Sequence, residues 1–149
     1  MKGYGEVHQV VGFAKSLTIR ILMKETVMEY MFLIYHDTEG YETVSQETIE
    51  ACMKIMREIQ TEARSKGILK AAAGLGKPNT ARTLRMRNGK FGITDGPFAE
   101  TKEALGGYYI IDCKDDVEAE YWAERIASAS GNATIEIRRI DQGGRQASA

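Results

Sequence analysis

Hydrophobic and polar positions alternate along this chain in blocks of strand and helix length. Residues 30–35 (Tyr-Met-Phe-Leu-Ile-Tyr) form a continuous apolar run, which predicts a central strand covered on both faces. Residues 68–73, 108–112 and 134–140 are three further strand-like runs. The segment between the second and third of these four runs is less regular, and it contains the most informative local pattern.

That pattern is a hairpin in which Asn88-Gly89, the dipeptide typical of a type I′ turn, separates residues 82–87 from residues 90–95. A two-residue loop fixes the register, so the expected pairs are Arg87 with Lys90, Met86 with Phe91, Leu84 with Ile93, and Arg82 with Asp95. Paired side chains share a face. The sequence therefore predicts one apolar face, which we expect to be buried, with Asp95 and Arg82 opposite each other at its far end and Phe98 folded back as an apolar plug.

Two segments have the spacing of amphipathic helices. The first begins at Thr43 or Ser45, either of which can be the N-cap, and ends at Lys66-Gly67. Its apolar stripe consists of Ile49, Cys52, Met53, Met56, Ile59 and Ala63. The second helix begins at Asp115 and ends at Gly131-Asn132. Its stripe consists of Ala119, Trp122, Ala123, Ile126 and Ala127.

The resulting order, β-α-β, hairpin, β-α-β, predicts an α+β fold: a ferredoxin-like antiparallel sheet with two helices on one face. Such a sheet has an open face, and apolar residues on both sides of the first strand need a cover there. We therefore expect a homodimer packed sheet against sheet. The domain is predicted to span residues 28–141, followed by a disordered tail over 142–149. Residues 1–27 are expected to be an N-terminal extension, either a mis-start upstream of Met28 or an added strand over residues 17–23.

Composition narrows the function classes. The chain has 149 residues and a net charge of −1 with no basic block, which argues against nucleic-acid and anionic-membrane partners. No apolar run approaches 18 residues, so no transmembrane helix is predicted. The two cysteines lie far apart and only two histidines occur, so neither a metal site nor a cofactor is expected. Unpaired thiols fit a cytoplasmic protein.

Residues 95–103 (Asp-Gly-Pro-Phe-Ala-Glu-Thr-Lys-Glu), followed by residues 105–108 (Leu-Gly-Gly-Tyr), carry a family resemblance. They closely resemble the signature of DGPF-type proteins in the YCII-related family. The resemblance implies a dimeric α+β barrel. It also implies acid/base chemistry by a His-Asp pair, as in muconolactone isomerase-like barrels, with the histidine in the first helix. Residues 48–66 contain no histidine, so this chain lacks the histidine of that pair in its first helix.

The candidate site follows from these two observations. Asp95 is the first catalytic candidate, and His36, in the remaining His-Asp pair His36-Asp37, is the second. The expected ligand is a small polar or anionic molecule in a cleft beside residues 95–103, which we call the DGPF segment. The residues expected to bind it are Arg82, Asp95, Gly96, Pro97, Phe98, Gly107 and Tyr108. One alternative is a non-catalytic accessory protein acting through a protein partner, as the family's sigma-factor-linked transcription label suggests. In another, the DGPF segment only braces the fold.

Overall fold

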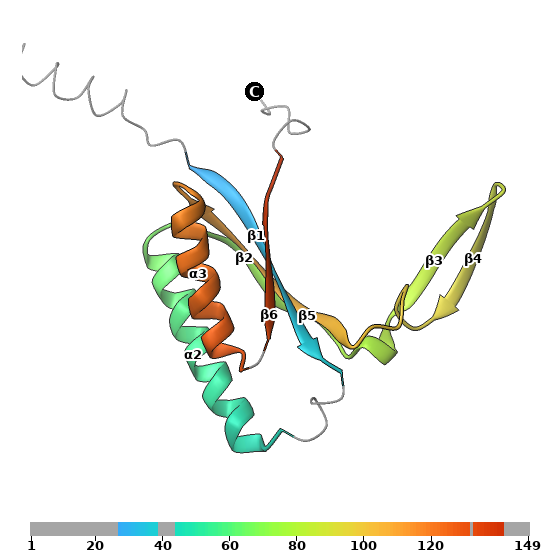
Figure 1. The fold of residues 1–149 in the computed structure, drawn as a ribbon, viewed down its shortest axis with the longest axis horizontal. Helices are drawn as coiled ribbons and strands as arrows, with labels where there is room; N and C mark the ends of the chain where they lie inside the picture. The colour runs from blue at the N-terminus through green and yellow to red at the C-terminus, as the bar shows by residue number, and fades with distance from the viewer. Residues whose placement is uncertain (1–26, 39–43, 132, 142–149) are drawn as a thin grey trace, which may run out of the picture.

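The computed structural model describes residues 27–38, 44–131 and 133–141. The predictions for residues 1–26 and 142–149, and Thr43 as a helix cap, lie outside these ranges. The elements, in chain order, are β1 (Met28–Asp37), α2 (Gln46–Ser65), β2 (Leu69–Gly74), the short 3-10 helix η2 (Pro78–Thr80), β3 (Arg82–Arg87), β4 (Lys90–Asp95), β5 (Glu103–Cys113), α3 (Asp116–Ala129) and β6 (Thr134–Arg139) (Figure 1).

Four of the strands form an antiparallel sheet in the order β2-β5-β1-β6. Helices α2 and α3 lie side by side on one face of this sheet (Figure 1). The predicted ferredoxin-like α+β arrangement is confirmed, and β1 is a central strand as expected. No helix or strand in the described part of the chain covers the other face, which we call the open face.

The core lies between the sheet and the helices. Alternate residues of β1 and β5 point toward the helices, as the two-residue period of a strand requires. The buried side chains of the core are Tyr30, Phe32, Ile34, Ile59, Ala63, Tyr109, Ile111, Cys113, Ala119, Trp122, Ala123, Ile126 and Ala129. The intervening residues of β1, such as Met31 and Leu33, are half-buried on the open face.

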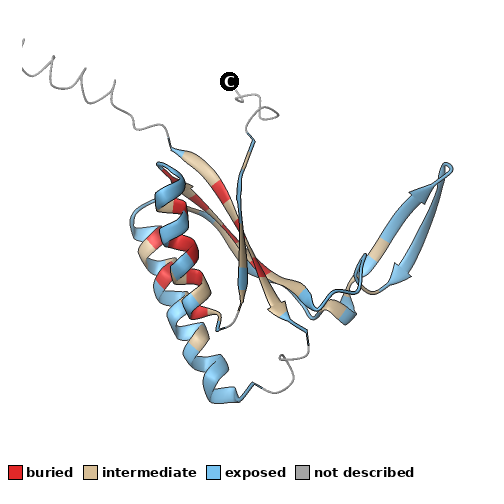
Figure 2. Cartoon of the chain, in the orientation of Figure 1, coloured by how far each residue is buried: buried red, intermediate tan, exposed pale blue. Residues whose placement is uncertain are grey.

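Both helices begin at side-chain caps. Ser45 Oγ accepts a hydrogen bond from the Thr48 N–H at 3.2 Å, and Asp115 Oδ1 accepts one from the Glu118 N–H at 2.8 Å. The predicted stripe of the first helix is wrong over its first half, where Ile49 and Met53 are exposed. The reason is the difference in length between the helices, since α2 has 20 residues and α3 has 14. The first turns of α2 therefore extend past the end of α3 (Figure 2).

The hairpin has the predicted register, pair for pair, with Asn88 and Gly89 both at positive φ. Its predicted environment is wrong. Strands β3 and β4 form a separate two-stranded sheet that projects from the body of the molecule (Figure 1). Leu84, Met86, Phe91 and Ile93 are between 55 and 70% exposed. Figure 2 shows most of the hairpin in the colour of exposed residues. Phe98 is 77% exposed and is not a plug. Two connecting segments, residues 75–81 and 96–102, place the hairpin beyond the end of the core.

Strand β5 begins at Glu103, earlier than the predicted strand over residues 108–112. The strand has both a bulge and a close backbone approach at Gly106-Gly107. The register between β1 and β5 shifts beside Gly106. A Cβ on Gly107 would lie 2.9 Å from the Ala73 carbonyl oxygen, so only glycine allows β2 and β5 to approach this closely.

Candidate functional site

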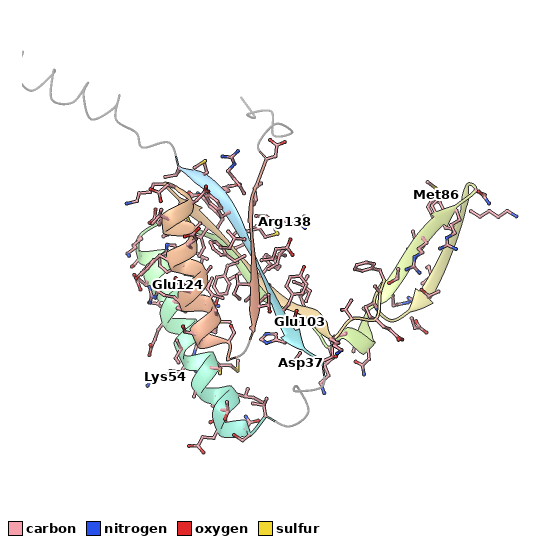
Figure 3. All side chains as sticks on the ribbon, in the orientation of Figure 1. Asp37, Lys54, Met86, Glu103, Glu124 and Arg138 are labelled. Atoms are coloured by element: carbon pink, nitrogen blue, oxygen red, sulfur yellow. The ribbon has the colours of Figure 1, made fainter. Side chains whose placement is uncertain are left out.

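A pocket lies where β1 ends, β5 begins and the segment between β2 and β3 leaves the sheet beside β5. Its volume is about 260 Å³. Figure 3 shows Asp37 and Glu103, which end β1 and begin β5, at this end of the sheet. The lining residues are His36, Thr38, Leu75, Gly76, Lys77, Pro78, Asn79, Ala104, Leu105 and Gly106.

His36 and Gly106 meet on one side of this pocket. His36 pairs with Ala104 across the β1–β5 ladder, and the bulge then brings the Gly106 backbone against the imidazole. A Cβ at Gly106 would lie 2.5 Å from His36 Cδ2, so a larger residue would displace the ring. Burial lowers the pKa of His36 below its usual value. The imidazole is therefore neutral near pH 7, with one nitrogen as a hydrogen-bond donor and the other as an acceptor.

Hydrogen bonds to backbone carbonyl oxygens connect the pocket to the end of the DGPF segment. The Thr38 N–H and the Thr38 hydroxyl both donate to the Lys102 carbonyl oxygen, at 2.9 and 3.1 Å. The Leu75 N–H donates to the Gly106 carbonyl oxygen at 2.8 Å. These bonds hold the end of β1, the start of β5 and the β2–β3 connection in one arrangement around the pocket.

The β2–β3 connection supplies two of the four polar side chains of the lining, Lys77 and Asn79. The Thr80 N–H and hydroxyl both donate to the Lys77 carbonyl oxygen, at 2.9 and 2.7 Å, and this closes a compact turn that contains Pro78. Lys77 is the one cationic side chain among the lining residues, which also include the Asn79 amide and the Thr38 hydroxyl. No lining residue is an Asp or a Glu. The lining therefore suits a polar molecule with a negative charge.

The predicted DGPF residues lie outside this lining. Asp95 pairs with Arg82 at 3.7 Å, as the register predicted, but the Asp95 side chain is 94% exposed. Such an exposed pair contributes little to stability. Gly96 adopts a φ of 95°, its N–H donates to the Ala81 carbonyl oxygen, and its own carbonyl oxygen accepts from the Thr83 hydroxyl at 2.8 Å. These contacts place the Gly96-Pro97 turn at the base of the hairpin.

Phe98, Gly107 and Tyr108 are also outside the pocket lining. The Arg85 guanidinium donates to the Phe98 carbonyl oxygen at 2.5 Å, while the Phe98 ring is exposed. Gly107 is buried within the sheet, and Tyr108 pairs with Leu33 on the open face. Of the candidates named from the sequence, His36 lines the pocket. Asp37 points to the opposite face of β1, so the two adjacent residues do not form a catalytic pair there.

Sequence reasoning missed Thr38, Lys77 and Asn79. The available signal was a glycine-rich turn directly after a strand of small residues, Gly74-Leu75-Gly76-Lys77-Pro78. It lacks the spacing of a phosphate loop, and a turn with this pattern is usually an ordinary connection. A turn of this kind becomes a pocket wall only when a second strand ends beside it, and the local pattern does not contain that information.

Comparison with known proteins agrees with the resemblance carried by the DGPF segment. Residues 28–142 match the YCII-related domain. The chain belongs to the YCII-related family. This YCII-related chain is also 36% identical over 114 residues to an uncharacterized protein of Rhizobium meliloti (strain 1021). The alignment covers 76% of this chain and 92% of that protein. These two matches show the family and name no activity.

Within the described residues, no three His, Cys, Asp or Glu side chains come together as metal ligands. Neither helix of the described ranges is both long and apolar enough to cross a membrane.

Proposed function

We propose that this YCII-related protein binds a small polar or anionic molecule in the His36 pocket, beside the end of the DGPF segment. The observation that carries the proposal is the lining: one ammonium group, a neutral imidazole, an amide and a hydroxyl surround a pocket without a carboxylate. The volume of about 260 Å³ lies slightly below the usual range of about 300–1,000 Å³ for ligand pockets, which favours a molecule of few atoms.

Each polar group has a distinct part in the proposed binding. Lys77 supplies the positive charge, which a flexible stem can bring to different positions of an anion. His36 donates or accepts one hydrogen bond and can carry a proton between ligand and solvent. The Thr38 hydroxyl already donates to a backbone carbonyl, so its lone pairs remain for a donor on the ligand.

Isothermal titration calorimetry with inorganic phosphate and a series of small mono- and dicarboxylates tests this proposal. We expect saturable binding of at least one of these probes, weakened tenfold or more by Lys77→Ala. Lys90→Ala is the matched control, because it removes the same charge from the hairpin, outside the pocket lining. Absence of saturable binding by every probe, or equal losses in the two variants, would contradict the proposal.

We also propose that the chain forms a homodimer through the open face. Met31, Leu33 and Tyr108 are only half-buried there, although each lies in a central strand of the sheet. A second copy on this face would remove that apolar surface from water. The alternative, an accessory protein acting through a different protein, requires an apolar surface that stays exposed once the homodimer has formed.

A further inference from the structure

The hairpin formed by β3 and β4, which we call the arm (residues 82–95), exposes an entire apolar face. Leu84, Met86, Phe91 and Ile93 share that face and are each more than half exposed. An isolated two-stranded hairpin is at best marginally stable in water, and the arm pairs with no third strand of the described part of the chain. Figure 3 shows Met86 near its tip, away from the body. The arm therefore needs a surface that covers it.

The charge of the arm indicates what kind of surface this is. The arm holds four cations and one acid, Asp95, and so has a net charge of +3. The whole chain has a net charge of −1, so the remaining residues together carry −4. The arm is thus complementary in charge to the rest of its own chain, and complementary charge promotes the encounter of two surfaces.

The open face has the two properties that a partner surface for the arm needs, which are apolar side chains and a negative charge. Its side chains are identified by the strand pairings and by the ion pair between Lys70 and Asp112. The apolar side chains on it are Met31, Leu33, Tyr35, Ala71, Ala73, Leu105, Tyr108 and Ile110. The charged ones are the acids Glu29, Asp37, Glu103, Asp112 and Glu136 and the cations Lys70 and Arg138, which gives a net charge of −3.

We propose that the arm packs its apolar face on the open face of a second copy of this chain. A stable interface uses about 20–30 residues on each side, and neither the arm nor the open face supplies that number by itself. If each copy contributes both surfaces, the two together reach it. The basic side chains Arg87 and Lys90 lie on the other side of the arm, from which their long stems can reach acids at the rim of the interface.

This inference rests on the proposed homodimer, which it extends by a contact between arm and sheet, and it does not depend on the ligand pocket. Sedimentation equilibrium of the full chain tests it first. We expect a dimer whose dissociation constant rises tenfold or more in Phe91→Glu and also rises with salt concentration. Val117→Glu is the matched control, because Val117 is 73% exposed on α3, on the helical side of the molecule.

Crosslinking between two different chains then locates the contact. Met86→Cys on the arm and Met31→Cys on the open face are placed in separate chains that carry Cys52→Ser, one of them labelled with ¹⁵N. After mixing, a bismaleimide is expected to join one labelled to one unlabelled chain. Crosslinks formed only between two Met86→Cys chains, or no crosslink between a labelled and an unlabelled chain, would overturn the inference.

The remaining outcomes separate this inference from the proposed function. If Leu33→Glu dissociates the dimer and Phe91→Glu does not, the arm inference fails while the homodimer stands. If the wild-type chain is a monomer, or if its arm binds nucleic acid in place of a second copy, the arm inference fails too. Binding of phosphate or carboxylate probes by Phe91→Glu reports on the pocket alone. We expect that binding to be unchanged.

Discussion

The imidazole of His36 occupies the space next to Gly106 that any other residue would need for its Cβ. That atom would lie 2.5 Å from His36 Cδ2 and 3.2 Å from Nε2. The ring can keep this position on the pocket wall only because residue 106 is glycine and has no Cβ. This contact connects the Gly106-Gly107 pair of the DGPF signature with the candidate site. The start of the signature, residues 95–98, lies outside the pocket lining.

Gly106→Ala is expected to displace the imidazole from the pocket. Because the ring is the end of a side chain and is only partly buried, it can move, and we expect a loss of roughly 1 kcal/mol in the free energy of unfolding. Probe binding measured by calorimetry should weaken several-fold. Gly92→Ala, in a part of the arm where a Cβ meets open space, is the control and should leave binding unchanged. Full binding by Gly106→Ala would show that the ring position is unimportant.

The folded state should lose stability as the pH falls through the titration of His36. Burial lowers the pKa of this group from its usual value of 6.5, so the unfolded chain binds more protons below that pH. This contribution to stability is present above pH 6.5 and is lost as the pH falls through the lowered pKa. Urea unfolding between pH 7.5 and 5 should show a steeper fall for the wild type than for His36→Gln. Identical pH profiles would contradict the prediction.

The Tyr30 hydroxyl anchors the start of α3 to the sheet. It donates to Asp116 Oδ1 at 2.5 Å, and this hydrogen bond, together with burial, raises the pKa of Tyr30 to about 12. Tyr30→Phe should lower the free energy of unfolding by about 1–2 kcal/mol, measured by urea denaturation at pH 8. Tyr121→Phe, at an exposed tyrosine on α3, is the control. A loss no greater than that of the control would show that the bond contributes nothing.

The same bond predicts a dependence on alkaline pH. A raised pKa in the folded state means that its contribution is complete below pH 10 and is lost as the pH rises from 10 through about 12. The unfolding free energy of the wild type should therefore fall more steeply than that of Tyr30→Phe over this interval.

Asp95→Ala tests whether the DGPF segment braces the fold. Because the carboxylate is almost fully exposed and its pairing with Arg82 is long, we expect no measurable change in thermal unfolding. Thr83→Ala removes the partly buried hydrogen bond to the Gly96 carbonyl oxygen and should cost about 1 kcal/mol. A larger loss from Asp95→Ala than from Thr83→Ala would restore the brace interpretation.

The features that were predictable from the sequence are those determined by residues close together in the chain. Asn88-Gly89 fixes both the turn and its flanking register, and Asp115 fixes the start of α3, because each depends on atoms within a few residues. The location of the hairpin was not predictable in this way. An apolar face demands a cover, but the pattern does not say whether the cover belongs to the same chain.

The candidate site shows the same division. Paired glycines at the entry of a strand are typical of a bulge or a close backbone approach, and Gly106-Gly107 shows both. Lys77 and Thr38 come from separate connections, which meet only after β1, β2 and β5 have paired. Asp95 was favoured for its motif and its paired cation, and both features are equally compatible with a solvated turn.

The most direct measurement is a ¹H–¹⁵N correlation spectrum of the full chain during titration with the phosphate or carboxylate probe that binds in calorimetry. If the ligand occupies the His36 pocket, the amide signals of Gly76, Lys77 and Gly106 should shift with one common dissociation constant, while those of Gly89 and Gly96 stay in place. Shifts centred on Gly96 and its hairpin neighbours, with the Gly106 signal unchanged, would contradict the proposed site.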